Sequence, residues 1–472
     1  MPEALPSTDH TGQDEEVLMR IRSRSRRTAF AAMAAALALV VSACAGAGGG
    51  SGGDGKQTVT IATVANPQMQ DIEKLSSRFE EEHPDIDLNF VILPENELRD
   101  RVTQDIATEA GQYDVVTIGT YETPIWAENG WLAPLSEYAS DPAYDVNDIL
   151  EPVRAALSYE DTMYAAPFYG ESSFLMYRKD LFDKAGLTMP EQPTWQQVAE
   201  FAKELDDPRT NTAGICLRGL PGWGEVLAPL NSVMLTFGGH WYDEQWQAQL
   251  TSPESKQAVE FYVDLVRQYG EPGAPSAGFS ECLTAMGQGN AAMWYDATVA
   301  ASSLEDPKTS KVAGKIGYVP APVVKTDHSG WLWAWSLAIP QTSERKDAAW
   351  EFVSWATSKE YIKLVGNELG WTRVPPGSRQ STYELPEYQR AAKAFAEPTL
   401  NAIRNVDVRQ PGVHPQPWVG VQYVAIPEFQ DLGTKVSQEI SAAIAGRQSV
   451  DEALAKGQRY AEQTAKEGGY QK

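Results

Sequence analysis

Strand-like and helix-like hydrophobic patterns alternate regularly over residues 58–118. Residues 58–64 alternate Thr with β-branched or small apolar side chains, and 86–92 and 114–118 are similar apolar runs, as expected for strands. Two sets of apolar residues recur between these runs at helical spacing: Ile72, Leu75 and Phe79, then Leu98, Val102 and Ile106. Alternating β and α units predict a mainly parallel sheet covered by helices, which is the α/β class.

The same patterns continue along the chain. Residues 172–177 form an apolar run, and helices are expected over 195–205, over 255–269 and after Glu344. One apolar stripe, typical of core packing, consists of Val259, Tyr262, Val263 and Val266. The roughly 415 residues that follow position 56 are enough for two domains with their own cores.

An export signal precedes this region. Five arginines between Arg20 and Arg27 are followed by an apolar run that ends in Val41-Ser42-Ala43-Cys44. The order of cationic, apolar and small residues is that of a secretory signal, and the Cys after small residues resembles the bacterial lipoprotein pattern. We therefore expect a signal peptide over residues 1–43, with 1–18 an extension before an alternative start at Met19. The alternative, a transmembrane anchor, requires about 20 apolar residues, more than this run offers.

Cys44 would then be the lipid-modified first residue of the mature protein. Residues 44–56 are mostly Gly and Ser and predict a flexible tether. We expect the protein at the extracellular face of the cell membrane, attached through the lipid anchor only.

The charge of the chain excludes some functions. There are 64 acidic against 39 basic residues, a formal net charge of −25. Nucleic-acid binding depends on clustered Lys and Arg, so no nucleic-acid partner is expected, and a neutral or cationic small ligand fits better. The histidines, at positions 10, 83, 240, 328 and 414, are too scattered for metal-ligand spacing. We expect no metal and no cofactor.

Two cysteines remain after Cys44. In an oxidising exterior, Cys216 and Cys282 are predicted to pair as a disulfide. Two separate buried thiols are the alternative, because the sequence does not show how far apart their Cα atoms lie.

Tryptophan is the distinctive residue of the globular region. The chain has 14, many in segments flanked by Gly or Pro. Indole rings cover the weakly apolar flanks of a sugar or polyol, while amides, carboxylates and Arg satisfy its hydroxyl groups. The composition therefore favours an uncharged carbohydrate or polyol as the ligand.

Several motifs resemble the extracellular solute-binding proteins that feed sugar transporters of the ATP-binding-cassette type, the family of the maltose-binding protein. Residues 113–116 with 126–135, residues 174–182 with Pro193-Thr194-Trp195, and residues 445–454 are similar to that family's motifs. Arg178 stands where the family commonly has Asn. Residues 331–340 look most like the subset that binds linear sugar alcohols such as mannitol and sorbitol.

The resemblance implies two α/β lobes, each a mainly parallel sheet covered by helices, joined by crossover hinge strands, with the ligand bound between them. It places residues 57–166 and 297–343 in lobe one, and 167–296 and 344–472 in lobe two. The lobes are expected to close on the ligand, and the closed form is expected to be recognised by the permease subunits of an importer. The protein is expected to be a monomer.

The ligand contacts implied by the resemblance lie on loops and strand ends of both lobes. They are Asn66, Gln68, Tyr121, Glu122, Tyr169, Glu171, Trp223, Trp294, Asp296, Trp331, Trp333, Trp371, Arg373 and Trp418. Trp223 and Trp418 are expected to be aromatic platforms.

The favoured hypothesis is thus a lipid-anchored receptor for a polyol or small sugar, without catalysis. A second is a secreted glycoside-acting enzyme with Glu171 and Asp296 as acid and base, since a carboxylate pair suffices for that chemistry. A third is an adhesion or envelope-structural lipoprotein, which would bind no small molecule saturably.

Overall fold

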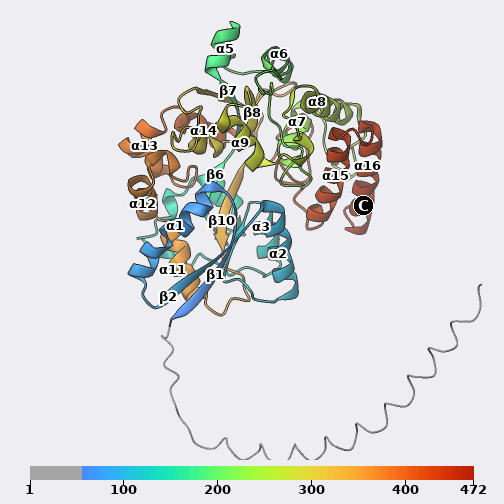
Figure 1. Cartoon of the computed structure of the whole chain (residues 1–472). Coiled ribbons are helices and arrows are strands. Elements are labelled where there is room, and N and C mark those ends of the chain that lie inside the picture. Colours follow the sequence, from blue (N-terminus) through green and yellow to red (C-terminus); the bar gives the residue numbers. More distant parts are fainter. Residues whose placement is uncertain (1–55, 472) are drawn as a thin grey trace, which may run out of the picture. The chain divides into compact units, whose positions relative to one another are not determined.

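The computed structural model describes residues 56–471, and two β-sheets organise them (Figure 1). The predicted signal peptide, Cys44 and nearly all of the tether lie outside the described residues. Within residues 56–471, no helix combines the length and the apolar character needed to cross a bilayer.

The first sheet has five strands in the order β2-β1-β3-β10-β6. β1 is parallel to β2 and β3, whereas β10 is antiparallel to β3 and β6. Its strands are β1 (Gln57–Val64), β2 (Ile86–Leu93), β3 (Val115–Ile118), β6 (Ala165–Glu171) and β10 (Trp333–Ala338). The helices packed around it include α1 (Pro67–Glu82), α2 (Glu95–Thr108), α3 (Glu122–Glu128) and α11 (Lys346–Ala356). This sheet with its helices is the first lobe.

The second sheet has three strands in the order β8-β7-β9. They are β7 (Ser173–Arg178), β8 (Met293–Ala297) and β9 (Ile316–Pro320). The helices of this second lobe include α5 (Lys179–Ala185), α6 (Trp195–Leu205), α7 (Leu227–Phe237), α8 (Pro253–Tyr269), α9 (Phe279–Gln288), α15 (Phe429–Ile444) and α16 (Val450–Glu467).

The remaining described elements are short or peripheral. They are η1 (Tyr138–Ser140), η2 (Val146–Asp148), α4 (Glu151–Ala156), β4 (Ser158–Tyr159), β5 (Thr162–Met163), η3 (Ala274–Ser276), α10 (Ala300–Leu304), α12 (Lys359–Glu368), η4 (Trp371–Arg373), η5 (Gln380–Glu384), α13 (Pro386–Ala391) and α14 (Ala396–Asn405).

Local sequence explains the helix starts. Thr194 caps α6 with a capping box, in which its hydroxyl accepts from the Gln197 amide while the Gln197 side chain accepts from the Thr194 amide. Ser252 caps α8, with Pro253 at the first helical position. The stripe Val259, Tyr262, Val263 and Val266 is buried, which confirms its predicted place in the core.

The second sheet corrects the prediction of mainly parallel strands in each lobe. β7 is antiparallel to both of its neighbours. The first residue of β7, Ser173, pairs with the last residue of β8, Ala297. β7 leads away from the first sheet while β8 and β9 return towards it, so their directions must oppose that of β7.

The chain passes directly from one sheet to the other. Ser172 alone separates β6 from β7, and residues 321–332 connect β9 to β10. The fold is thus a two-lobe α/β structure with crossover strands, as predicted.

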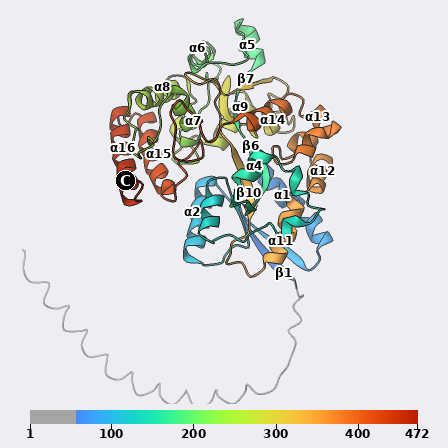
Figure 2. The same ribbon diagram turned by 180° about the vertical axis from the view of Figure 1, so that it is seen from behind.

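The predicted lobe bounds stay a prediction, and packing departs from them in several stretches. Residues 167–171 of β6 fall within 167–296 but pair with β10 of the first sheet. β9 falls within 297–343 but pairs with β7 of the second sheet. α11 falls within 344–472 but packs against α1, β1 and β6 (Figures 1 and 2). Hydrophobic patterns define elements but not which sheet they join.

Candidate functional site

A small pocket, lined by side chains of both lobes, lies between them. The first lobe contributes Asn66, Glu95, Arg99, Glu171, Trp333 and Trp335 to its lining, and the second contributes Arg218, Trp223, Gly224, Ala228, Phe279 and Gln422, with Ala297 and Val299 at and beyond the end of β8. Residues of both lobes are therefore needed to form the pocket.

Arg99 of α2 is held among tryptophans and carboxylates. Its guanidinium carbon lies 4.0 Å from the centre of the Trp223 ring, 4.8 Å from Trp335 and 5.0 Å from Trp333. Its Nε and Nη2 donate to Glu95 Oε1 at 3.1 and 3.0 Å, and its Nη1 donates to Glu122. A guanidinium has more N–H donors than these bonds use. Arg99 therefore keeps donors for a molecule in the pocket.

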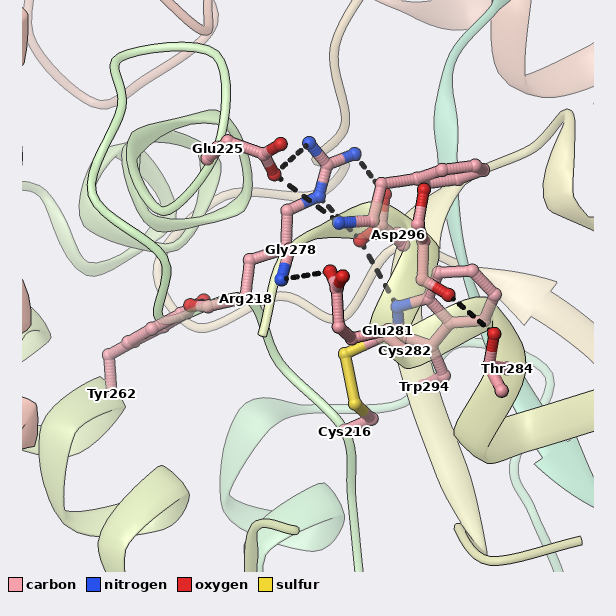
Figure 3. The surroundings of a disulfide bond; sticks show 12 residues. Cys216, Arg218, Glu225, Tyr262, Gly278, Glu281, Cys282, Thr284, Trp294 and Asp296 are labelled. Atoms are coloured by element: carbon pink, nitrogen blue, oxygen red, sulfur yellow. Dashed lines mark hydrogen bonds and ion pairs between the residues drawn. A yellow bond between two sulfur atoms is a disulfide. The ribbon is translucent and has the colours of Figure 1, made fainter. Parts of the chain in front are cut away.

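Arg218 is the second cation of the pocket (Figure 3). It makes a bidentate pair with Asp296, with Nε to Oδ2 at 2.8 Å and Nη2 to Oδ1 at 2.6 Å. Its Nη1 donates to the Gly224 carbonyl at 2.8 Å and to Glu225 Oε2 at 3.4 Å. Trp294 Nε1 also donates to Asp296, at 3.1 Å. These bonds fix the guanidinium in one orientation.

A disulfide supports this cluster. Cys216 and Cys282 are bonded, with their Cα atoms 5.6 Å apart, as the sequence predicted. Cys216 precedes Arg218 by two residues, and Cys282 lies on α9, which begins with Phe279 (Figure 3). The bond therefore ties together the two segments that bring Arg218 and Phe279 to the pocket.

Two buried carboxyl groups at the site have raised pKa values. Burial is the main cause of the rise for Glu171, whose pKa lies well above its usual range despite the opposing field of Arg218. Burial and then the nearby Glu95 carboxylate raise the pKa of Glu225 to about 8, again against Arg218. At neutral pH the Glu225 carboxyl group therefore favours the uncharged form.

The stability of the protein is expected to depend on Glu225. Because its pKa rises from 4.5 to about 8 on folding, the folded state keeps a proton that the unfolded state loses between these values. The stabilisation is complete below pH 4.5 and is lost as the pH rises through 8. Glu225→Gln should reduce the pH slope of the unfolding free energy by at most about 1.4 kcal/mol per pH unit.

Urea denaturation at several pH values measures that slope. Burial of Glu271 raises its pKa to about 7, so Glu271 and Glu171 act in the same direction and a smaller slope should persist in the variant. An unchanged slope in Glu225→Gln would contradict the assignment.

Two pocket-lining side chains have polar atoms without a partner. Trp223 Nε1 and Gln422 Oε1 are buried and make no hydrogen bond to any described residue. One is a donor and the other an acceptor. A ligand hydroxyl group can accept from the first and donate to the second, which suits a polyhydroxylated molecule.

Four of the predicted ligand contacts line the pocket: Asn66, Glu171, Trp223 and Trp333. Four others support its lining. Tyr169 accepts from Asn66 Nδ2 at 2.7 Å, Glu122 accepts from Arg99, and Asp296 with Trp294 orients Arg218.

The other six are not part of the lining, and their predicted contact with a ligand stays a prediction. They are Gln68, Tyr121, Trp331, Trp371, Arg373 and Trp418. Gln68 donates to Ser302 Oγ at 2.7 Å, and Arg373 makes a bidentate pair with Asp71. Trp418 packs on Tyr242 and Trp246. Gln68, Arg373 and Trp418 thus contact other side chains of the protein, and the sequence did not predict these contacts.

Several lining residues were not predicted: Glu95, Arg99, Arg218, Phe279, Trp335 and Gln422. A signal existed for Trp335, because strand alternation places it on the same face as Trp333. No pattern in the sequence marked Arg99 or Arg218 as residues of the pocket.

The family profile described as bacterial extracellular solute-binding protein matches residues 65–363. The chain therefore belongs to this family, whose members bind solutes. It is 48% identical to a mannitol-binding protein of Pseudomonas aeruginosa over 417 residues, which cover 88% of this chain and 95% of the relative.

Solved structures agree with this assignment. A solute-binding protein of an ATP-binding-cassette transporter from Agrobacterium vitis, with bound D-mannitol, superposes with a TM-score of 0.87 at 51% identity and covers 88% of this chain and 100% of its own. One from Agrobacterium radiobacter in complex with ribitol has a TM-score of 0.76 at 26% identity, covering 86% and 98%.

Proposed function

We propose that this protein is a receptor that binds a linear polyol, with mannitol as the first candidate, and delivers it intact to an importer of the ATP-binding-cassette type. The observation that carries the polyol assignment is the D-mannitol in a structure 51% identical to this chain. The lining of the pocket supports this assignment. Both lobes contribute indole rings, guanidinium groups and hydrogen-bond acceptors to it. Binding to both lobes at once would favour the closed form.

The proposal includes an anchor and partners. Cys44 would hold the protein at the outer face of the membrane, and the permease subunits would recognise the closed, monomeric receptor. Metabolic labelling with a fatty-acid analogue, compared between the wild type and Cys44→Ser, tests the anchor.

Calorimetry tests the ligand directly. A hexitol has about twelve heavy atoms, which at roughly 0.6 to 0.8 kcal/mol per atom gives a Kd near micromolar. Mannitol and sorbitol are expected to bind in this range and to raise the melting temperature. If hexitols, pentitols, hexoses and disaccharides all fail to produce heat or a thermal shift, the proposed function is wrong.

The enzyme hypothesis loses its proposed acid/base pair. Asp296 is fully buried, is not part of the pocket lining, and is bonded to Arg218 and Trp294. It therefore has no free position from which to act on a substrate beside Glu171.

A further inference from the structure

Helix α15 begins without a capping side chain of its own. Its N-cap residue is Glu428, whose side chain makes no capping bond. The first N–H groups of a helix have no partner within the helix. Tyr121 supplies one of the missing partners, because its hydroxyl accepts from the Gln430 amide at 3.2 Å. The same hydroxyl donates to the Ile426 carbonyl oxygen at 3.0 Å, and the Pro427 carbonyl oxygen lies 3.2 Å from it as a second acceptor.

Tyr121 belongs to the opposite lobe. It lies between β3 and α3 of the first lobe, whereas α15 packs on α8 and α16 of the second. Figures 1 and 2 show α15 beside α2. The cap is therefore supplied across the line where the lobes meet.

Two further bonds cross the same line. Thr103 Oγ1 of α2 donates to Gln430 Oε1 at 3.1 Å. The Tyr423 hydroxyl donates to Thr120 Oγ1 at 3.1 Å. The Tyr121 ring also meets Trp223 edge to face, with centroids 4.9 Å apart. Together these contacts form a seam beside the pocket, and of its residues Trp223 alone also lines the pocket.

We infer that Tyr121 is a positioning residue that stabilises the closed arrangement by capping α15 from the other lobe, without touching the ligand. The inference rests on the proposed function, because it presupposes that ligand binding and lobe closure are coupled. Separating the lobes would expose the end of α15 to water and release the Tyr121 hydroxyl. A residue of this kind adds the same free energy to the binding of every ligand that requires closure.

The test compares Tyr121→Phe with Tyr242→Phe in the full-length protein. Tyr242 is a matched control, since its buried hydroxyl donates to the Ala461 carbonyl at 2.9 Å within the second lobe. Calorimetry with mannitol, sorbitol and ribitol should show that Tyr121→Phe raises each Kd by about fivefold, the factor that corresponds to about 1 kcal/mol for a helix cap. The ranking of the three ligands should not change. Tyr242→Phe should lower the melting temperature and leave every Kd unchanged.

The outcomes separate the inference from the function on which it rests. If the wild type binds a polyol but Tyr121→Phe has unchanged affinity, the inference is overturned and the receptor function stands. It is also overturned if only one ligand is weakened, because that pattern indicates direct contact. If the wild type binds no polyol, the proposed function and the inference fall together. Should Tyr121→Phe not fold, Thr103→Val removes a neighbouring bond of the seam and is expected to raise every Kd by one common, smaller factor.

Discussion

Arg218→Ala is expected to abolish measurable polyol binding and to lower the free energy of unfolding by about 3–5 kcal/mol. The change leaves Asp296 without its bidentate partner in a fully buried position and removes a cation from the pocket wall. Calorimetry measures the first effect and urea denaturation the second. Retention of wild-type affinity would show that Arg218 has no part in binding.

Two variants separate stability from binding. Arg218→Met combined with Asp296→Asn removes both charges, which should recover much of the stability without recovering affinity. Arg209→Ala is the control in the same lobe, because Arg209 is exposed and pairs with the nearby Asp207 at the surface. It is expected to leave both measurements unchanged.

Trp223→Ala is expected to weaken binding by about 10- to 100-fold, because the substitution removes the ring that lies 4.0 Å from the Arg99 guanidinium. It also removes the unpartnered Nε1 donor from the pocket wall. Trp223→Phe keeps an aromatic ring without that donor, so it should lose less affinity. Isothermal titration with mannitol measures both.

The control for this series is Trp131→Ala. Trp131 is 38% exposed and is not part of the pocket lining. The Trp131→Ala variant should bind mannitol with wild-type affinity. Equal affinity of Trp223→Ala and the wild type would exclude Trp223 from the site.

The fold was largely predictable because strand and helix periods leave strong local patterns. The strands predicted at 58–64, 86–92 and 114–118 match β1, β2 and β3 within a few residues. The direction of β8 and β9 was not predictable in this way. It depends on where each strand returns to the first sheet, and local periodicity carries no such information.

The site was harder to predict, as two arginines of α2 illustrate. Arg99 pairs with Glu95 and Arg101 pairs with Glu97, both at i,i+4 spacing. The Arg99 side chain is 6% exposed and lines the pocket, whereas that of Arg101 is 55% exposed. The same i,i+4 spacing therefore occurs in a buried site residue and in a surface pair, and only tertiary packing from both lobes distinguishes them.

The junction between β6 and β7 has a consequence for engineering. Glu171 ends β6 in the pocket, and Ser172, the sole residue before β7, exchanges backbone and side-chain bonds with Thr298. The pocket wall and the connection between the two sheets thus share the same short stretch of main chain. We expect substitutions at Glu171 to change ligand preference and the ease of bending at this junction together.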